Sequence, residues 1–255
     1  MKLTILGSGT TFTTKQRNAP GYILEIGQDR VLLDAGEGTK KRIIEAGFDI
    51  YNISHIFITH FHIDHINEIP AILWDFSGQR QGKNLYFYGP PGFKKLFKEW
   101  TNLLFPGLLA KKFFKVIIKE CGKDSFNLKD VRIKTEPGDK HGLVKYQNSV
   151  FFRFEHQNKS FVYAGDVHYD YPKELIAISQ NADVLLIESA NPDQKKVADH
   201  LTPSQAGKIA TEAGVKKLVL THFYPTCEKY DLKKQAQKTY KGPIVLAKDL
   251  MDIKI

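Results

Sequence analysis

The sequence has few of the residues that would cross-link it or anchor it in a membrane. Two cysteines, Cys121 and Cys227, occur among 255 residues, too few for the disulfide framework of a small secreted protein. No apolar run approaches the roughly 18–20 residues that cross a bilayer. The opening stretch 1–6 is too short for a secretory signal, because Gly7 follows it directly. These absences favour a reduced, cytoplasmic setting with no membrane partner.

Acidic residues are also scarce relative to basic ones. The chain has 28 Asp and Glu against 37 Lys and Arg, a net charge of +9. A basic balance favours polyanionic partners such as nucleic acid or phosphate-bearing substrates, although a solvated lysine-rich surface without a partner has the same composition. Linkers rich in serine and glycine, low-complexity tracts and short-period repeats are absent from the sequence, which predicts one domain over residues 1–255.

Short apolar runs rich in β-branched and aromatic residues alternate with amphipathic stretches along the chain. Strands are predicted at 3–6, 22–26, 30–34, 55–59, 84–88, 113–118, 131–135, 150–154, 161–164, 184–187, 217–220, 244–246 and 251–253. Helices are predicted at 37–46, 66–76, 93–104, 172–179, 203–213 and 232–240. The pattern indicates an α/β fold in which mixed sheets, antiparallel near the N-terminus, are covered by helices on their outer faces.

Four of the predicted strands run into a side chain that can bind a metal ion. These side chains are Asp34, His60, Asp166 and His222. Because the carboxyl ends of buried strands in α/β folds meet at one edge of the core, the four side chains are expected to converge there.

The segment from His60 to His65 carries the strongest chemical signal. It contains three imidazoles and a carboxylate within six residues, His60, His62, Asp64 and His65. Imidazole and carboxylate ligands suit zinc, manganese or iron, and the lack of thiolate argues against a structural zinc knuckle. A polar loop with unrelated histidines is the alternative, which four such groups at this spacing disfavour.

This segment resembles the signature T-H-x-H-x-D-H of the metallo-β-lactamase superfamily, which stands here as Thr59–His65. The other elements of that family have counterparts in the same order, at Leu33–Thr39, Lys140–Gly142, Ala164–Asp166 and Leu220–Phe223. The resemblance covers nearly the whole chain. It implies an αββα four-layer sandwich, in which two mixed β-sheets are flanked by helices, with a dinuclear metal site at one edge.

The resemblance also implies a role for each of these side chains. The metal ligands that it implies are His60, His62 and His141 for one ion and Asp64, His65 and His222 for the other. Asp166 would bridge the two divalent ions, together with a water or hydroxide that attacks the substrate. Asp34 would hydrogen-bond one of the ligands and orient it. Zn²⁺ is the expected ion, with Mn²⁺ and Fe²⁺ as alternatives.

Further motifs are similar to those of ribonuclease Z, the tRNA 3′-end processing family. Gly7–Thr10 followed by Lys15, Arg17 and Asn18 resembles the opening of that family, and the D-x-G-E segment from Asp34 resembles another of its motifs. The implied function is a phosphodiesterase that acts on RNA ends or on a small phosphodiester. Lys15, Arg17 and Asn18 would then contact the substrate, and His168 is a further candidate because it follows Asp166 closely.

The same family has a paired glutamate and histidine, which correspond here to Glu188 and to His200 in the stretch 200–206. Cleavage of a phosphodiester expels an alkoxide, which benefits from a proton donor. We therefore predict that His200, oriented by Glu188, is the general acid, and Asp64 completes the predicted catalytic set. The alternative for His200 is a capping role beside the helix that begins at Pro203.

The sequence departs from ribonuclease Z in one spacing that bears on substrate capture. Between His141 and Asp166 there are 24 residues (166 − 141 − 1), whereas that family commonly inserts a long tRNA-gripping arm in this interval. Ile187 also stands where a histidine usually precedes the glutamate. The sequence therefore predicts a short, armless relative.

A second stretch combines basic and aromatic residues. It contains Lys94, Lys95, Lys98, Lys111, Lys112, Lys115 and Lys119, interleaved with Phe93, Phe97, Trp100, Phe105, Phe113 and Phe114. Such a surface can follow a nucleic-acid backbone, or the aromatics can be core residues and the lysines merely solvated.

The sequence is also compatible with two other functions, and the resemblance predicts an oligomeric state. The same metal centre could hydrolyse a lactone or a thioester, or the chain could be a non-catalytic nucleic-acid-binding module. Relatives in the superfamily are often dimers, so a homodimer is the expected assembly.

Overall fold

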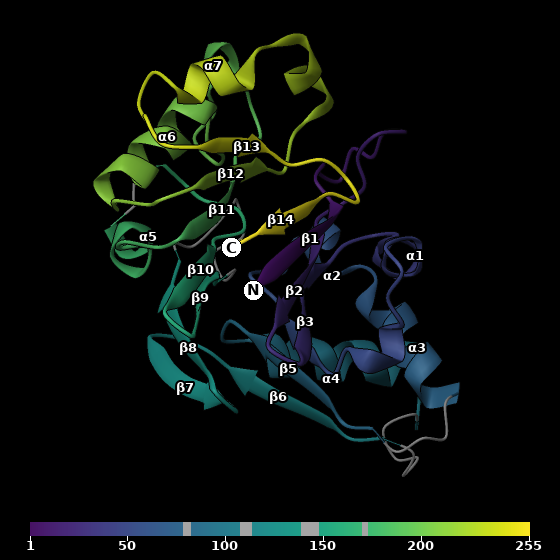
Figure 1. The fold of residues 1–255 in the computed structure, drawn as a ribbon. Helices are drawn as coiled ribbons and strands as arrows, with labels where there is room; N and C mark the ends of the chain where they lie inside the picture. The colour runs from purple at the N-terminus through teal and green to yellow at the C-terminus, as the bar shows by residue number, and fades with distance from the viewer. Residues whose placement is uncertain (79–82, 108–113, 139–147, 170–172) are drawn as a thin grey trace.

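The computed structural model describes residues 1–255 apart from 79–82, 108–113, 139–147 and 170–172. Its strands form two seven-stranded sheets that face each other (Figure 1). The first sheet has the order β14-β1-β2-β3-β4-β5-β6, with β1 Lys2–Gly7, β2 Gly21–Ile26, β3 Asp29–Ala35, β4 His55–Phe57, β5 Leu85–Gly89, β6 Val116–Glu120 and β14 Asp252–Lys254. The second has the order β13-β12-β11-β10-β9-β8-β7, with β7 Asp124–Leu128, β8 Val131–Pro137, β9 Val150–His156, β10 Lys159–Tyr163, β11 Val184–Glu188, β12 Leu218–Thr221 and β13 Ile244–Leu246.

Both sheets are mixed, and each combines an antiparallel part with a parallel part. Strands β14, β1, β2 and β3 pair antiparallel, whereas β3, β4, β5 and β6 run parallel. In the second sheet β7 to β10 pair antiparallel, and β10 to β13 run parallel. The antiparallel pairing predicted near the N-terminus is therefore confirmed.

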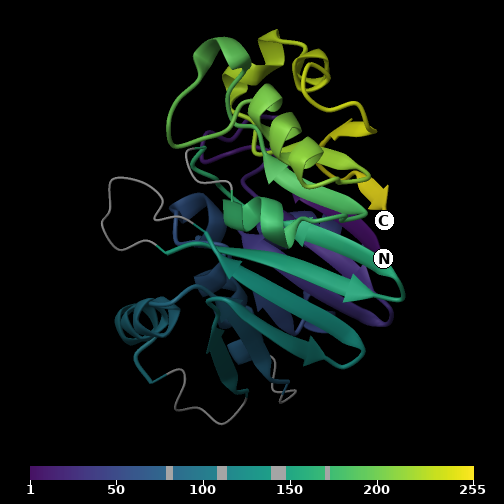
Figure 2. The same cartoon turned by 90° about the vertical axis from the view of Figure 1, so that its left-hand side faces the viewer.

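Helices cover the outer face of each sheet, so the molecule has four layers (Figures 1 and 2). The helices are α1 Thr39–Glu45, α2 Ile63–Ile66, α3 Ile69–Gly78, α4 Phe93–Leu104, α5 Lys173–Ile178, α6 Pro203–Glu212 and α7 Leu232–Ala236. One apolar cluster fills the space between the sheets. A second cluster packs the second sheet against its helices, and a third packs the first sheet against its helices. The predicted αββα sandwich is confirmed. None of the helices in the described ranges is long and apolar enough to cross a membrane.

The predicted helix over 66–76 is wrong in detail, because the structure has two helices there. The short helix α2 ends at Ile66, and α3 begins at Ile69. Pro70 has no backbone N–H to give to the carbonyl four residues earlier, and the Glu68 N–H donates instead to the Ala35 carbonyl at 2.9 Å. The hydrogen bond to Ala35 ties the segment after α2 to the end of strand β3. Helix α2 carries two of the predicted metal ligands.

Strand β7 is absent from the predictions. Its sequence, Asp124–Leu128, has Asp, Ser and Asn in three of five positions, and these residues have low strand propensity. The strand forms because it pairs along its length with β8 at the edge of the second sheet. The remaining predicted strands and helices are present with ends shifted by a few residues.

The carboxyl ends of strands in both sheets bring the predicted ligands together. Asp34 lies in β3, and His60, Asp166 and His222 follow the carboxyl ends of β4, β10 and β12. Because β3 and β4 are parallel, and β10 to β12 are parallel, these ends gather at one edge of the sandwich.

Candidate metal centre

Asp166 lies at the centre of the converging side chains and is 3% exposed. Its Oδ1 atom is 3.3 Å from the Nε2 atoms of both His65 and His222. Its Oδ2 atom is 3.5 Å from His60 Nε2 and 3.7 Å from His62 Nδ1. Each carboxylate oxygen thus faces a different pair of imidazoles, which is the arrangement expected of a residue that bridges two ions.

The first group of ligand atoms is contributed by Asp64, His65 and His222. His222 Nε2 is 3.3 Å from Asp64 Oδ2 and 3.3 Å from His65 Nε2. All three side chains are buried, and one ligand atom from each lies within 4.8 Å of the others. Two facing imidazole nitrogens and two carboxylate oxygens at such spacings fit a divalent cation with nitrogen and oxygen ligands.

The second group contains His60 and His62, whose rings are 4.5 Å apart. His60 is fully buried, and burial lowers the pKa of its imidazole to about 4. The ring is therefore neutral at pH 7, which is the form that binds metals. His62 is partly exposed and sits at the open side of the cluster. His141, the third predicted ligand of this group, lies outside the described residues.

Asp34 is fully buried and accepts four hydrogen bonds. One comes from His65 Nδ1 at 2.7 Å, two come from the N–H and the hydroxyl of Thr59, both at 2.8 Å, and the last comes from the hydroxyl of Tyr163. The bond to Nδ1 fixes the His65 ring so that Nε2 points at the cluster. Asp34 thus lies where the resemblance to the superfamily puts it.

The backbone around the cluster adopts conformations that few residues tolerate. Asp34 has φ 52° and His222 has φ 60°, and such left-handed angles in residues other than glycine concentrate at functional sites. Gly165 has φ 67°, and a Cβ atom there would lie 2.6 Å from the Thr59 hydroxyl. Only glycine fits at this position, and it directs Asp166 inward.

Beside the cluster, the buried Glu188 and the partly buried His200 form a hydrogen-bonded pair. Glu188 is 1% exposed and faces His200 Nδ1 at 3.1 Å. Burial opposes charge on the His200 ring, but the Glu188 carboxylate outweighs burial and raises the pKa of His200 to about 10. His200 Nδ1 is also 3.9 Å from Asp166 Oδ2. A protonated imidazole is therefore held next to the candidate metal centre, and cations bound there would lower its pKa again by repulsion.

Of the residues predicted to contact substrate, Arg17 and Asn18 donate hydrogen bonds to other groups of the protein. Arg17 donates to Glu228 at 2.6 Å, to the Ser8 hydroxyl at 2.7 Å and to the Ala247 carbonyl at 2.8 Å. The Asn18 amide donates to the backbone of Glu37. These bonds hold the loop over residues 8–18 in place. Direct contact of the two side chains with substrate stays a prediction.

The other two predicted contacts are more open to solvent. Lys15 is exposed on the same loop. His168 is partly exposed, and its Nε2 atom is 3.7 Å from Asp199 on the segment that leads to His200. Contact of these two side chains with substrate also stays a prediction.

The basic and aromatic stretch divides into a buried part and an exposed part. Phe93, Phe97 and Phe114 pack in the core between the first sheet and its helices, so they are not available to nucleobases. Lys94 and Lys98 lie exposed along α4. Lys111, Lys112 and Phe113 lie outside the described residues. For Phe93, Phe97 and Phe114 the interpretation as core residues is confirmed.

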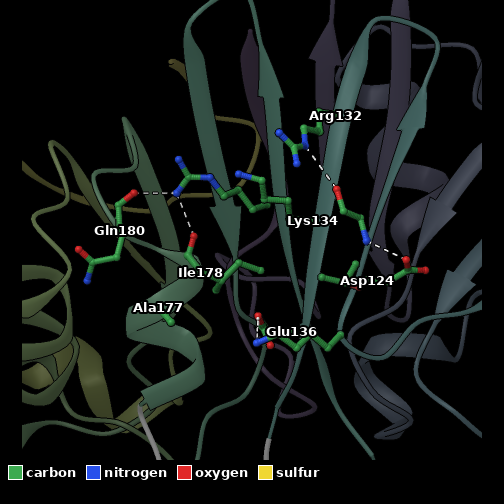
Figure 3. Close-up of a pocket in the computed structure, with 11 residues that line it drawn as sticks. Asp124, Arg132, Lys134, Glu136, Ala177, Ile178 and Gln180 are labelled. Carbon is green, nitrogen blue, oxygen red and sulfur yellow. Dashed lines mark hydrogen bonds and ion pairs between the residues drawn. The ribbon is translucent and has the colours of Figure 1, made fainter.

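A hollow of about 610 Å³ lies away from the metal cluster, where α5 meets β8 and β9 (Figure 3). The guanidinium of Arg153 donates to the carbonyls of Ile178 and Gln180 at 2.9 and 2.8 Å. Lys134 is 2.9 Å from Glu155. Arg153 and Lys134 are therefore already paired with protein groups, and nothing in the hollow connects it to the candidate metal centre.

The structure adds three residues to the site that sequence reasoning missed. Thr59 and Tyr163 bind Asp34, and Tyr224 places its hydroxyl 3.5 Å from His200 Nε2. Tyr163 ends the strand before Asp166, and Tyr224 follows His222 by two residues. The only signal in the sequence was this closeness to a predicted ligand.

Known proteins are similar to this chain in sequence. The family model described as "Beta-lactamase superfamily domain" matches residues 29–223. Ribonuclease Z of Archaeoglobus fulgidus is 25% identical over 301 aligned residues, covering 100% of this chain and 97% of that protein. Ribonuclease Z of Enterococcus faecalis is 29% identical over 307 residues, covering 99% and 97%.

Solved structures show the same fold. The metallo-β-lactamase fold protein YhfI from Bacillus subtilis superposes with a TM-score of 0.82 at 23% identity, covering 99% of this chain and 98% of that one. The short form of human tRNase Z superposes with a TM-score of 0.80 at 24% identity, covering 100% and 99%.

Proposed function

This chain belongs to the β-lactamase superfamily, and we propose that it is a metal-dependent phosphodiesterase of the ribonuclease Z type. The observation that carries the proposal is the pair of Glu188 and His200 beside Asp166, because a held proton donor serves the departure of an alkoxide. The ribonuclease Z relatives support it, since their matches cover nearly the full length of both chains.

The side chains of the cluster fit two divalent cations. Asp64, His65 and His222 would hold one ion, and His60 and His62 would hold the other, with Asp166 between them. When bound, two such ions supply a water of lowered pKa and neutralise charge that develops on a phosphoryl group. We propose Zn²⁺ as the native ion, because imidazole and carboxylate ligands suit it, and elemental analysis of the purified protein would distinguish it from Mn²⁺ or Fe²⁺.

The remaining residues orient these ligands and move one proton. Asp34 holds His65 through Nδ1. Glu188 occupies Nδ1 of His200, so Nε2 is the nitrogen that can give a proton to the leaving oxygen. The burial of Glu188 keeps the pair of side chains in one geometry.

We infer that the substrate is RNA and that it is held without the arm of longer relatives. The alignment to the Archaeoglobus protein spans 301 positions against 255 residues here, so at least 46 positions (301 − 255) have no counterpart in this chain. A groove of about 500 Å³ between α4 and β6 is lined by Lys94, Lys98 and Lys115 over an apolar floor. Helix α4 begins beside the ligand segment, since Phe93 stacks on Phe61 at 5.6 Å. The groove therefore offers a basic track along a helix that begins beside the ligand segment.

The test is a substrate screen of the purified protein reconstituted with Zn²⁺, Mn²⁺ or Fe²⁺. We expect cleavage of bis(p-nitrophenyl) phosphate and of a tRNA precursor with a 3′ extension. Asp166→Asn and His62→Ala should abolish both activities, whereas Asp130→Asn, at an exposed site far from the cluster, should change neither.

Two other outcomes would select other functions. Turnover of lactones or thioesters without turnover of phosphodiesters would identify a hydrolase of carbonyl substrates. Binding of RNA without turnover of any substrate, unaffected by His200→Ala, would identify a non-catalytic nucleic-acid-binding module.

A further inference from the structure

An aromatic ring projects into solvent beside the candidate metal centre. Phe12 is 60% exposed, and its ring lies 5.6 Å from that of Tyr224 with 46° between the planes. Tyr224 in turn packs edge-on against His200, with ring centroids 5.7 Å apart. A continuous row of rings therefore leads from the candidate proton donor outward to solvent.

The loop that carries Phe12 is held firmly at both of its ends. The Gly9 N–H donates to the Asn18 carbonyl at 2.9 Å, and the Phe12 N–H donates to the Thr10 hydroxyl at 3.2 Å. The Ser8 carbonyl accepts from the Phe223 N–H at 2.9 Å, which ties the loop to the segment that carries Tyr224. The ring of Phe12 is thus presented by a fixed backbone.

Protein stability does not account for the position of Phe12. A ring that is 60% exposed has buried little apolar surface, so folding gains little from it. Exposed aromatic rings on fixed loops are instead typical of binding surfaces, because they offer a large contact area at low cost in conformational entropy.

We propose that Phe12 and Tyr224 form an aromatic wall that stacks the nucleobase of the nucleoside whose oxygen leaves. This inference rests on the proposed phosphodiesterase function. His200 must lie next to the leaving oxygen to protonate it, so the nucleoside that carries this oxygen lies next to Tyr224. Every nucleobase has a π-face, so the wall selects nucleosides over alkyl groups without strong sequence preference.

The experiment uses metal-loaded protein and short RNA substrates that carry an abasic residue on one or the other side of the scissile bond. With the base intact, Phe12→Ala should lower kcat/KM about 5- to 150-fold. With the abasic residue on the leaving side, wild type should lose the same factor, and Phe12→Ala should cost nothing more. Phe12→Trp should retain activity, and Phe12→Leu, which keeps an apolar side chain without a π-face, should not.

Two results would overturn the wall. One is an unchanged kcat/KM for Phe12→Ala on RNA with the base intact, and the other is an equal loss on intact and abasic substrates. Metal content and thermal unfolding of each variant serve as controls, and both should match wild type because the Phe12 side chain is exposed.

A binding measurement separates this inference from the proposed function. Fluorescence anisotropy with labelled single-stranded RNA reports stacking whether or not the RNA is cut. Absence of cleavage by wild type would refute the phosphodiesterase, whereas equal RNA affinity of wild type and Phe12→Ala would refute the wall.

Discussion

If Glu188 orients His200 as the proton donor, the effect of a Glu188 substitution on the cleavage rate should depend on the leaving group. Glu188 accepts from the Val167 N–H at 2.9 Å and from the Ala190 N–H at 3.2 Å, besides its contact with His200 Nδ1 at 3.1 Å. Glu188→Gln keeps the size of the side chain but replaces one oxygen by an NH₂ group. If the amide oxygen faces Val167 and His200, the NH₂ group faces the Ala190 N–H. In the other orientation the NH₂ group faces Val167 and His200.

The size of the effect follows from the bond that is lost. A hydrogen bond to a charged group contributes about 1.5–3 kcal/mol, which corresponds to a factor of about 10 to 150 in rate. The carboxylate also raises the pKa of His200, so its removal leaves a smaller fraction of protonated imidazole at neutral pH. Cleavage of RNA, whose leaving oxygen is a strongly basic alkoxide, should slow by about this factor in kcat.

The assay compares RNA with bis(p-nitrophenyl) phosphate, whose leaving p-nitrophenolate is a weak base that departs without a proton. Glu188→Gln should slow RNA cleavage by this factor, His200→Ala should slow it at least as much, and both variants should retain most of their activity on the p-nitrophenyl ester. Metal content measured on each variant provides the control. An equal loss on the two substrates with full metal content would refute the assignment of His200 as the proton donor.

Three further changes test other parts of the molecule. Asp34→Asn removes the carboxylate that holds His65 and should weaken metal binding about 10- to 100-fold, measured by competition with a chelator; unchanged affinity would contradict the role of Asp34. Gly165→Ala places a Cβ atom 2.6 Å from the Thr59 hydroxyl at φ 67° and should lower the free energy of unfolding by about 1–3 kcal/mol, measured in urea. Lys98→Glu reverses a charge in the groove beside α4 and should reduce RNA cleavage and its dependence on salt, without changing turnover of the p-nitrophenyl ester; an equal effect on both substrates would exclude the groove as the RNA track.

Much of the fold can be predicted from local residue patterns in the sequence. The strands that cross the core are short runs of apolar residues, such as Val184–Ile187, and their β-branched or aromatic residues and their flanking residues indicate them without reference to neighbouring strands. Strand β7 could not be found in this way, because its residues favour a loop and only the pairing with β8 makes it a strand. The break before α3 lies at Pro70, within the range 66–76 that the apolar pattern predicts as one helix.

The convergence of the candidate ligands was predictable for a different reason. His60, His62, Asp64 and His65 lie within six residues, so local chain geometry already limits how far apart they can be. Asp166 and His222 are distant in sequence, and only their positions after buried strands, together with the family resemblance, connected them to this segment. The structure supplies what that connection lacked, namely that the two oxygens of Asp166 face different imidazole pairs.

The partners of the ligands could not be read from the sequence, because their roles depend on contacts across the sandwich. Tyr163 reaches Asp34 from the opposite sheet, across 129 positions of the chain, and an aromatic residue in a buried strand otherwise signals only core packing. Arg17 shows how contacts add a role that its sequence position does not reveal. The resemblance to ribonuclease Z predicts that Arg17 contacts substrate, and in the structure its donors meet Glu228, Ser8 and Ala247. The same residue type can bind a substrate or hold the loop that does so, and only the positions of its acceptors decide between the two roles. In this chain they favour the second role, which makes the rigid presentation of Phe12 the contribution of Arg17 to the site.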